Sequence, residues 1–216
     1  MPTPWLQIPI TDYEQHMSHA AVAQAQMLSR LLQEAIFEYQ PHSIAILGAA
    51  GGNGLEKVDP MTVRRVVAVD VNPAFLALCT ERYSRRFERY EAIVHDLSAG
   101  APSFEPVDFI YAGLLLEYVD YGAFLVHSPR LVLPAGRFVA LIQLPSATLP
   151  TVSDSPFASL RQLESIFHFV DPVAVRAILR GRGFTCCTEK TIHLESGKEF
   201  HYAVFRFGRA SSEIRQ

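Results

Sequence analysis

Short apolar runs alternate with segments of helical spacing along this chain of 216 residues. Residues 1–10 carry three prolines and are expected to form an extended arm. Between Thr11 and Tyr39 apolar side chains recur every three or four positions without an interrupting Gly or Pro, which predicts one long helix. Five later segments are apolar enough to form strands: 43–48, 65–70, 91–95, 107–111 and 136–144.

Helical segments separate these strands. Asn72 and Pro73 are typical of a helix start, and apolar residues then recur every four positions, which predicts a helix to about Arg89. Further helices are expected within 120–130, 157–169 and 171–180. Two last strands follow at 184–194 and 198–207, joined by a hairpin turn.

The order of these elements predicts the fold class. Strands that alternate with helices form parallel sheets, and a tight final hairpin makes its second strand antiparallel to the first. We therefore predict an α/β fold. It is a Rossmann-like, seven-stranded, mostly parallel sheet with helices on both faces and an antiparallel C-terminal hairpin. Residues 1–216 are expected to form a single domain.

Net charge, apolar runs and cysteine content argue against several classes of function. The formal charge of −3 provides no basic surplus, so we expect no nucleic-acid partner. No apolar run is long enough to span a bilayer, and the N-terminus lacks a secretory pattern, so no membrane association is expected. Three cysteines without a spaced framework favour a reducing, cytoplasmic location.

A glycine-rich turn follows the first strand, with the sequence Leu47-Gly48-Ala49-Ala50-Gly51-Gly52-Asn53-Gly54. Glycine allows positive φ and lets a ligand approach the main chain. The next strand ends on Asp70, a carboxylate that can accept hydrogen bonds from both hydroxyls of a ribose. These features predict an adenosine-containing cofactor at the carboxyl ends of the strands. A helix start after Gly54 is expected to favour a cofactor carboxylate.

The glycine-rich turn and Asp70 can each also have a purely structural role. The turn can be tight without binding a ligand, and Asp70 can cap the next helix.

In this order and spacing the motifs resemble those of class I S-adenosylmethionine-dependent methyltransferases, over roughly residues 41–207. The resemblance rests on the glycine turn, Asp70, His95-Asp96-Leu97, Asp108-Phe109-Ile110-Tyr111, Leu133-Pro134-Ala135-Gly136 and the closing hairpin. There are two departures. Ile46 stands where the family usually has an acid that helps to bind the methionine amino group, and Ala50 stands at the middle glycine.

The resemblance implies S-adenosyl-L-methionine as cofactor and S-adenosyl-L-homocysteine as product. It implies that Asp70 binds the ribose, that Val71 packs on the adenine and that Asp96 accepts from the adenine amino group. The full set of cofactor-binding residues expected is Gly48, Ala49, Ala50, Gly52, Asn53, Asp70, Val71, Asn72, Asp96, Leu97, Ala112, Gly113, Tyr13 and His19. A loop carboxylate in solvent is the alternative for Asp96.

Catalytic groups are less sharply indicated. Glu117, Tyr118 and His16 are weak candidates for orienting an acceptor or taking its proton, against a solvated or capping role for the acid. Tyr13, His16 and His19 share one helix face and can line a lid, or can simply pack on the fold. No metal site is expected. Arg82, Arg85, Arg86 and Arg89 have helical spacing and are expected to form a solvated basic face.

The sequence thus predicts an enzyme that transfers a methyl group from S-adenosylmethionine, in line, to a small-molecule acceptor. Residues 1–40 are expected to form the arm and lid helix, and residues 144–170 an insertion that shapes the acceptor pocket. Two alternatives remain open: a non-catalytic S-adenosylmethionine-binding module and a nicotinamide-dependent oxidoreductase. The second lacks support because Gly48-Ala49-Ala50-Gly51 does not match the dinucleotide fingerprint.

Overall fold

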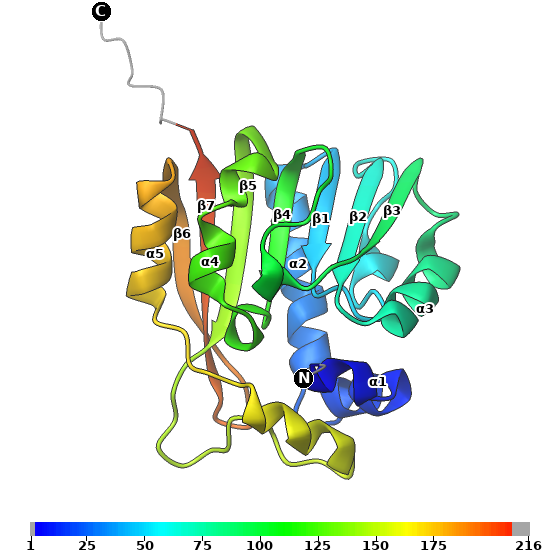
Figure 1. Ribbon diagram of the computed structural model, residues 1–216, viewed down its shortest axis with the longest axis vertical. Helices are drawn as coiled ribbons and strands as arrows, with labels where there is room; N and C mark the ends of the chain where they lie inside the picture. Colours follow the sequence, from blue (N-terminus) through cyan, green and yellow to red (C-terminus); the bar gives the residue numbers. More distant parts are fainter. Residues whose placement is uncertain (1–2, 209–216) are drawn as a thin grey trace, which may run out of the picture.

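A seven-stranded sheet runs through the protein in the order β3-β2-β1-β4-β5-β7-β6 (Figure 1). The computed structural model describes residues 3–208. The strands are β1 (Ser43–Leu47), β2 (Arg65–Asp70), β3 (Arg89–Val94), β4 (Val107–Gly113), β5 (Val132–Gln143), β6 (Phe184–His193) and β7 (Glu199–Phe207). Strand β7 is antiparallel to β5 and β6, and the other neighbours are parallel. The predicted sheet and closing hairpin are confirmed.

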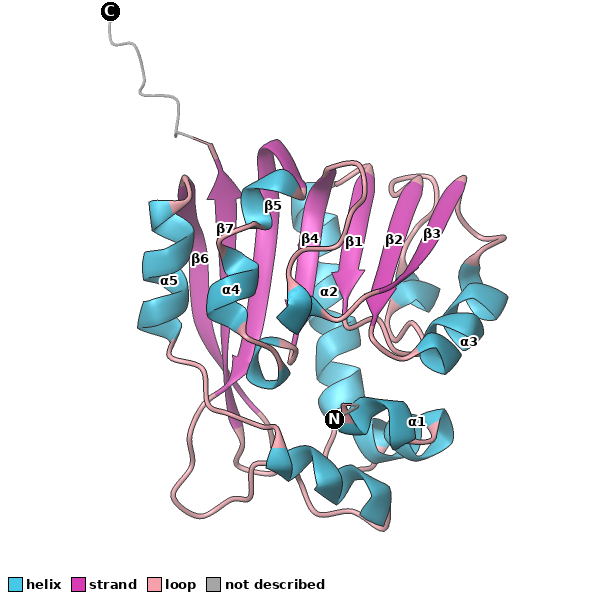
Figure 2. Ribbon diagram, viewed as in Figure 1, coloured by secondary structure: helices cyan, strands magenta, loops and turns pink. Residues whose placement is uncertain are grey.

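Helices cover both faces of this sheet (Figure 2). They are α1 (Ile10–Ser18), α2 (Gln24–Tyr39), α3 (Pro73–Tyr83), α4 (Tyr121–Leu125) and α5 (Pro172–Gly181). Two apolar cores result, because strands that are buried on both sides need cover on each face. One core contains Leu31 of α2 and Cys79 of α3, and the other contains Leu125 of α4 and Leu179 of α5. None of the helices within residues 3–208 is long and apolar enough to cross a membrane.

The prediction of one helix over residues 11–39 is wrong, because the chain breaks it between Ser18 and Gln24. Ser18 Oγ bonds to Glu14 O at 2.6 Å, a side-chain contact that competes with the helix ladder. Ala23 then adopts φ 51°, outside the helical region. The break lets α2 lie on the sheet while α1 lies across the carboxyl ends of the strands. The arm is also not fully extended, since Pro4–Gln7 form a 3-10 turn.

Two further helix predictions need correction. After Gly54 there is a 3-10 turn, Leu55–Lys57, and no α-helix before β2. The segment is short and contains Pro60, and an Asp59 turn redirects it (Met61 N to Asp59 Oδ1, 2.9 Å), so no helix dipole points at the glycine turn. Helix α3 ends at Tyr83, because Arg89 already pairs with Arg65 in the sheet.

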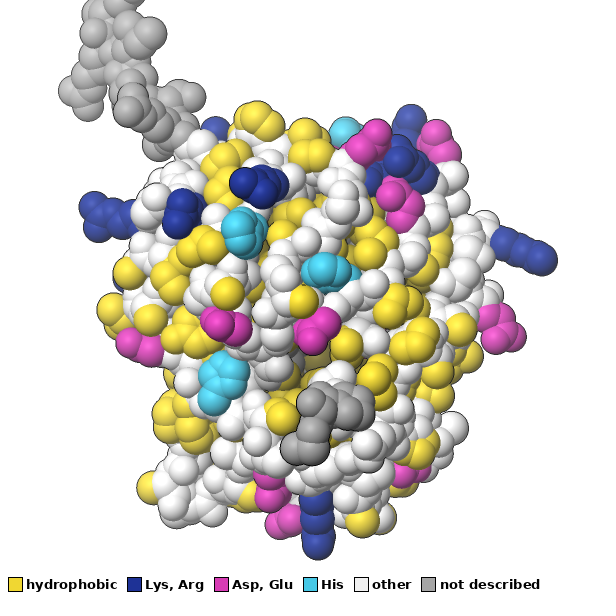
Figure 3. Space-filling model, viewed as in Figure 1, with side chains coloured by type: hydrophobic (Ala, Val, Ile, Leu, Met, Phe, Trp, Pro, Cys, Tyr) yellow, Lys and Arg dark blue, Asp and Glu magenta, His cyan; other side chains and the backbone are white. Residues whose placement is uncertain are grey.

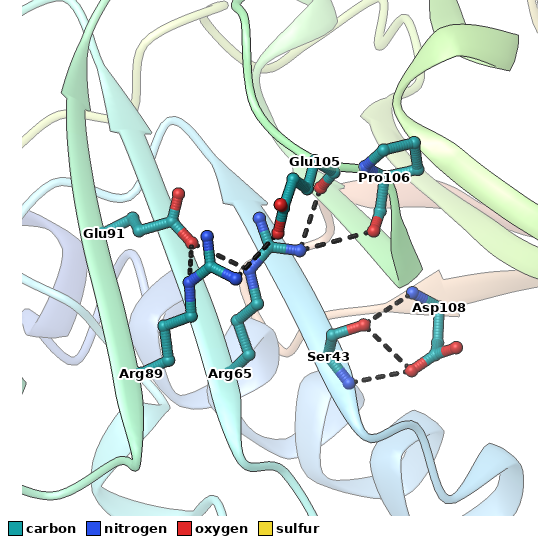
Figure 4. Close-up of polar contacts among 7 residues, drawn as sticks. All are labelled: Ser43, Arg65, Arg89, Glu91, Glu105, Pro106 and Asp108. Atoms are coloured by element: carbon teal, nitrogen blue, oxygen red, sulfur yellow. Dashed lines mark hydrogen bonds and ion pairs between the residues drawn. The ribbon is translucent and has the colours of Figure 1, made fainter.

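The arginines expected on one helix face are consequently dispersed. Arg82 pairs with Glu14 of α1, and Arg86 donates to Val58 O at 2.8 Å. Arg89 lies in β3 and joins Glu91, Glu105 and Arg65 in an ionic cluster at the amino ends of the strands (Figure 4). These groups anchor the fold at the edge opposite the carboxyl ends.

At the amino ends of the strands, β1 and β4 are also joined by reciprocal hydrogen bonds between two side chains and their main chain. Asp108 Oδ2 accepts from both the backbone N–H and the hydroxyl of Ser43, each at 2.9 Å, and Ser43 Oγ accepts from Asp108 N at 3.0 Å (Figure 4). Because this pairing sets the register of β1 against β4, it also sets which residues meet at their far ends.

A second layer lies beyond the carboxyl ends of the strands, formed by α1 and by residues 144–170 (Figure 2). The latter contain the 3-10 segment Ala158–Ser165, close to the short helix that was predicted there. Ser159 Oγ donates to Asp12 Oδ2 at 2.6 Å, and Ser155 Oγ bonds to His16 Nδ1 at 2.8 Å. These bonds join two segments distant in sequence into one roof over the edge of the sheet.

Candidate cofactor and acceptor site

A cavity of about 540 Å³ lies between the carboxyl ends of the strands and this roof. Its floor comes from the ends of β1, β2 and β4 and from the segment after β3, represented by Gly48, Asp70, Gly113 and Asp96. Its roof comes from the N-terminal arm, α1 and the 3-10 segment, represented by Trp5, Tyr13 and Ile166. A cavity of this size in this place can hold a nucleoside-sized ligand.

The glycine turn brings main chain to the cavity wall. Gly48 has φ +71°, and a Cβ there would lie 3.2 Å from Leu115 Cδ1, so the turn packs closely against the segment after β4. Ala50 has φ 45°, a conformation in which glycine is less strained. Gly48 and Ala50 both line the cavity. The turn therefore forms part of the cavity wall, and close approach of a ligand to it stays a prediction.

Gly52 is needed for packing of the turn against α3 and does not line the large cavity. Its φ is +88°, and a Cβ would lie 2.6 Å from the Tyr83 ring and 2.8 Å from Cys79 Sγ. We expect Gly52→Ala to lower the free energy of unfolding by about 1–3 kcal/mol, because it adds backbone strain and a clash with α3. Urea denaturation measures the change. Gly181→Ala is the control, since nothing lies within 4 Å of a Cβ at that helix end. Equal stability of the two variants would contradict the packing argument.

Asp70 lies at the end of β2 and lines the cavity. Its Oδ2 accepts from Ala50 N and its Oδ1 from Asn72 N, each at 2.8 Å. The carboxylate thus holds the glycine turn against the start of α3, while each oxygen keeps a second lone pair for a ligand. Burial raises the pKa of Asp70, and the backbone donors oppose that shift.

Three residues that the resemblance assigns to an adenine line the same cavity: Val71, Asp96 and Leu97. Leu97 is buried, whereas Asp96 is exposed and accepts from Ser98 N at 2.9 Å to cap a 3-10 turn. These residues follow β2 and β3, which are neighbours in the sheet. An aromatic ring lying between them would meet apolar surface on its face and a carboxylate at its edge.

Aromatic side chains close the opposite end of the cavity. The Trp5 ring meets Tyr13 at 5.9 Å and Tyr118 at 5.1 Å between centroids, both edge to face, and Tyr13 lies 5.7 Å from Phe75. These rings come from the arm, from α1, from the segment after β4 and from α3. Their π faces are suited to a positively charged ligand group.

A smaller chamber of about 40 Å³ lies behind these rings and shares Trp5, Tyr13, Leu114 and Tyr118 with the large cavity. Its walls are mostly apolar, and its polar groups are His16, Gln24, Glu117, Gln143, Thr151 and Ser153. Glu117 is 1% exposed, so the solvated alternative for this acid is wrong. Its Oε1 accepts from Gln143 N at 2.6 Å, and its Oε2 has no hydrogen-bond partner within residues 3–208.

Burial shifts the acid–base groups of this chamber. Burial raises the pKa of Glu117 to about 7, and it lowers the pKa of His16 to about 4, with the nearby Lys198 charge adding to the shift of His16. Lys198 donates to Gln143 Oε1 at 3.2 Å and to Thr151 O at 2.8 Å, and burial lowers its pKa to about 8. Near neutral pH the chamber is therefore lined by a neutral imidazole and by a carboxyl whose pKa is close to the ambient pH.

Other expected residues lie near the cavity without lining it. Ala49 and Ala112 are buried, Gly52 contacts α3, and Asn53 Nδ2 donates to Ala25 O at 3.0 Å. Asn72 caps α3 and donates to Trp5 O at 2.8 Å, so it supports the arm. His19 follows the end of α1 and accepts from Ala21 N. Their roles toward a ligand remain predictions.

The sequence reasoning missed several lining residues: Thr3, Pro4, Trp5, Phe75, His95, Ser98, Leu114, Leu115, Val119, Ser165 and Ile166. Phe75 was visible only as part of an apolar helix face. Trp5 lay in a proline-containing arm whose docking depends on distant residues.

The surface around the site has a mixed character. Figure 3 shows apolar side chains gathered near the middle of this face, with acidic and histidine side chains beside them, while Lys and Arg lie mostly toward its outline. Within residues 3–208 no group of three or more His, Cys, Asp or Glu side chains is arranged to hold a metal ion.

Comparison with known proteins identifies a methyltransferase domain in the chain. Residues 46–140 match a family model described as a methyltransferase domain. This span runs from the end of β1 to β5 and includes the glycine turn, Asp70, Asp96 and Glu117. No curated protein matches the chain.

Crystal structures of several methyltransferases share the fold. The N-methyltransferase NodS from Bradyrhizobium japonicum, in complex with S-adenosylhomocysteine, superposes with a TM-score of 0.63 at 17% identity, over 86% of this chain and 88% of its own. The Burkholderia thailandensis 1,6-didemethyltoxoflavin-N1-methyltransferase gives 0.64 at 15% identity, over 97% and 92%. The magnesium protoporphyrin IX methyltransferase of Synechocystis gives 0.64 at 12%, over 87% and 84%.

Two of these neighbours, NodS and the magnesium protoporphyrin IX methyltransferase, were crystallised with S-adenosylhomocysteine. The cavity of this chain lies at the carboxyl ends of the strands, the edge at which open α/β sheets bind ligands. Residues 46–140 thus match a methyltransferase domain, and the chain has the fold of crystal structures of S-adenosylmethionine-dependent methyltransferases.

Proposed function

We propose that this protein transfers the methyl group of S-adenosylmethionine to a small-molecule acceptor. The observation that carries the proposal is the pair of adjoining cavities, a large one on the sheet edge and a small one behind the aromatic rings. The roof over both is built from α1 and residues 144–170, which hydrogen bonds of Ser155 and Ser159 join together. This cover over the site favours a compact acceptor.

The residues present fit the adenosyl part of the cofactor. Asp70 has free lone pairs on a carboxylate at the cavity wall, which is what two ribose hydroxyls require. Val71 and Leu97 supply apolar faces for the adenine, and Asp96 supplies an acceptor for its amino group. Gly48 and Gly113 line the same cavity and bring main chain to the place we assign to the sulfur end. When bound, S-adenosylmethionine supplies a methyl group that its sulfonium has already activated.

The protein's task is then to position an acceptor and to exclude water. Tyr13, Tyr118 and Trp5 lie between the two cavities, so the acceptor atom belongs beside these rings. Holding it in line with the methyl carbon can remove roughly 7–11 kcal/mol of barrier. This positioning explains why the site needs no catalytic triad.

Glu117 is the group we assign to the proton of an acceptor that carries an N–H or O–H. Its Oε2 is buried, has no partner within residues 3–208 and lines the small chamber. A pKa of about 7 lets it accept a proton and release it near neutral pH. His16, neutral and fixed by Ser155, is suited to orienting the acceptor by a hydrogen bond.

Fold likeness alone does not select methyl transfer, since the [4+2]-cyclase SpnF superposes with a TM-score of 0.62 at 10% identity. Two measurements therefore test the proposal. In titration calorimetry we expect S-adenosylhomocysteine to bind and NAD not to bind. With S-adenosylmethionine tritiated on its methyl group and a cell extract as the source of acceptor, we expect label to pass to another molecule of the small-molecule fraction, one that chromatography separates from S-adenosylmethionine, and not to the macromolecular fraction.

The outcomes separate the alternatives. Heat with NAD alone would favour the oxidoreductase. Binding of S-adenosylhomocysteine without label transfer to either fraction would favour a binding module. Label in the macromolecular fraction would overturn the small-molecule assignment.

A further inference from the structure

A third cavity, of about 260 Å³, lies between α1, α2 and α3 on the far side of the glycine turn. Tyr13 and Ala50 line both this cavity and the large one, so the two cavities are neighbours across these two residues. Met17, Ala25 and Leu28 give it apolar walls.

An ion pair borders the cavity. Arg82 of α3 bonds to both carboxylate oxygens of Glu14 of α1, the Nη2–Oε2 distance being 3.1 Å, and Arg82 Nη1 also donates to Gly51 O at 3.1 Å. The side chains are 38% and 36% exposed. The third charged group, Glu56, accepts from Gly54 N at 2.9 Å and from Ser29 Oγ at 3.3 Å. Glu56 is thus committed to the turn.

Gly51 shows that this corner is built around the ion pair. Among the glycines of the turn, Gly48, Gly52 and Gly54 have positive φ, whereas Gly51 does not, so its backbone conformation does not require glycine. A Cβ at this position would lie 2.8 Å from Arg82 Nη1 and would also collide with the Glu14 carboxylate. Glycine at 51 therefore makes room for the two charged groups beside the main chain.

We propose that this third cavity binds the α-amino acid end of the cofactor, with Arg82 pairing with its carboxylate and Glu14 with its ammonium group. The proposal rests on the proposed function above, because it takes the adenosyl part to lie in the large cavity. An α-amino acid carries one group of each sign, and the ion pair presents one partner for each. The planar guanidinium fits a carboxylate with two bonds, and the apolar walls fit the methylene groups between sulfur and the α-carbon.

This assignment also accounts for the missing acid. Ile46 is 6% exposed and packs in the apolar core with Leu28 and Ala49, so β1 offers no carboxylate to the amino group. Glu14 provides one from α1 instead. The same contact would close α1 over the cofactor, because its partner Arg82 belongs to a helix that follows the ribose-binding strand.

Calorimetry with two ligands separates recognition of the amino acid from closure of the roof. S-adenosylhomocysteine carries the amino acid end, and 5′-methylthioadenosine has the same nucleoside and sulfur without it. We expect Arg82→Met and Glu14→Gln each to lower the affinity for S-adenosylhomocysteine roughly tenfold. The affinity of each variant for 5′-methylthioadenosine should stay within about twofold of that of the unmodified protein. Arg30→Met and Glu34→Gln are matched controls, since this pair (2.9 Å, 54% and 45% exposed) lies on α2 and borders none of the three cavities.

Each other outcome is decisive. If the affinities for both ligands fall equally, the ion pair only holds α1 in place, and the proposal is wrong. If neither affinity falls, the amino acid end binds elsewhere, and the proposal is also wrong. If the unmodified protein binds neither ligand, the proposed function fails first. Glu14→Gln keeps the shape and hydrogen-bonding ability of the side chain, so it preserves a folded test protein should Arg82→Met not fold.

Discussion

Asp70→Ala is expected to weaken S-adenosylhomocysteine binding by about 1.5–3 kcal/mol, or roughly 10- to 150-fold. The physical reason is the loss of a half-buried carboxylate that, by our proposal, accepts the two ribose hydroxyls. A second contribution comes from the glycine turn, because Asp70 also holds Ala50 N and Asn72 N at 2.8 Å. Titration calorimetry measures the affinity, and urea denaturation of the same samples reports whether the variant is folded.

Asp59→Ala is the matched control. Asp59 is exposed and accepts from Met61 N at 2.9 Å, so its removal also deletes a carboxylate that supports a turn, away from the cavity. Its affinity for S-adenosylhomocysteine should equal that of the unmodified protein. A folded Asp70→Ala variant with unchanged affinity would place the ribose at another position.

Glu117→Gln and His16→Gln are expected to change the pH dependence of stability in opposite directions. An unfolded glutamate ionises above pH 4.5, whereas Glu117 keeps its proton to about pH 7 in the folded protein. The unfolded chain therefore holds fewer protons in this window, and stability is lost as the pH rises through it. The shift corresponds to about 3 kcal/mol, and Glu117→Gln removes that loss.

His16 acts with the opposite sign. An unfolded histidine protonates below about pH 6.5, and His16 resists protonation until about pH 4, so its contribution is present above pH 6.5 and is lost as the pH falls. The size is about 1–3 kcal/mol. Between pH 4.5 and 6.5 the two groups offset each other in the unmodified protein.

Urea denaturation across pH 4.5 to 7 makes the test. Relative to the unmodified protein, Glu117→Gln should gain stability as the pH rises, and His16→Gln should gain as it falls. Glu164→Gln, on an exposed glutamate of the insertion, is the control and should follow the unmodified protein. Parallel curves for all four proteins would show that neither group is perturbed by burial.

The sheet was predictable because its evidence is local. Each strand is a short apolar run such as Val66–Val69, and the hairpin turn lies at Ser196-Gly197, so pattern and turn chemistry were sufficient. Helix ends were less predictable. The break at residues 19–23 contains no Gly or Pro, and it depends on the Ser18 side-chain bond and on the left-handed conformation of Ala23. The end of α3 at Tyr83 results from pairing of β3 with β2.

The candidate site divides in the same way. Gly48 and Asp70 were identifiable because a turn residue and a strand-end acid have local signatures. The buried state of Glu117 was not identifiable, because it depends on the end of β5 and on the insertion, which cover it. The Glu14–Arg82 pair joins residues 68 positions apart on two helices. Periodicity contains no information on such a contact.

By itself, the sequence determined the seven-stranded, mostly parallel sheet with its closing hairpin, and it predicted the carboxyl ends of the strands as the edge for a nucleoside. These features follow from backbone preferences and apolar spacing, which act over a few residues. Only the tertiary structure decided which side chains face one another across that edge: the aromatic partition, the buried carboxyl behind it and the charged pair beside Gly51. Their positions depend on how α1 and residues 144–170 pack over the strands, a long-range balance of burial and hydrogen bonding that no local pattern encodes.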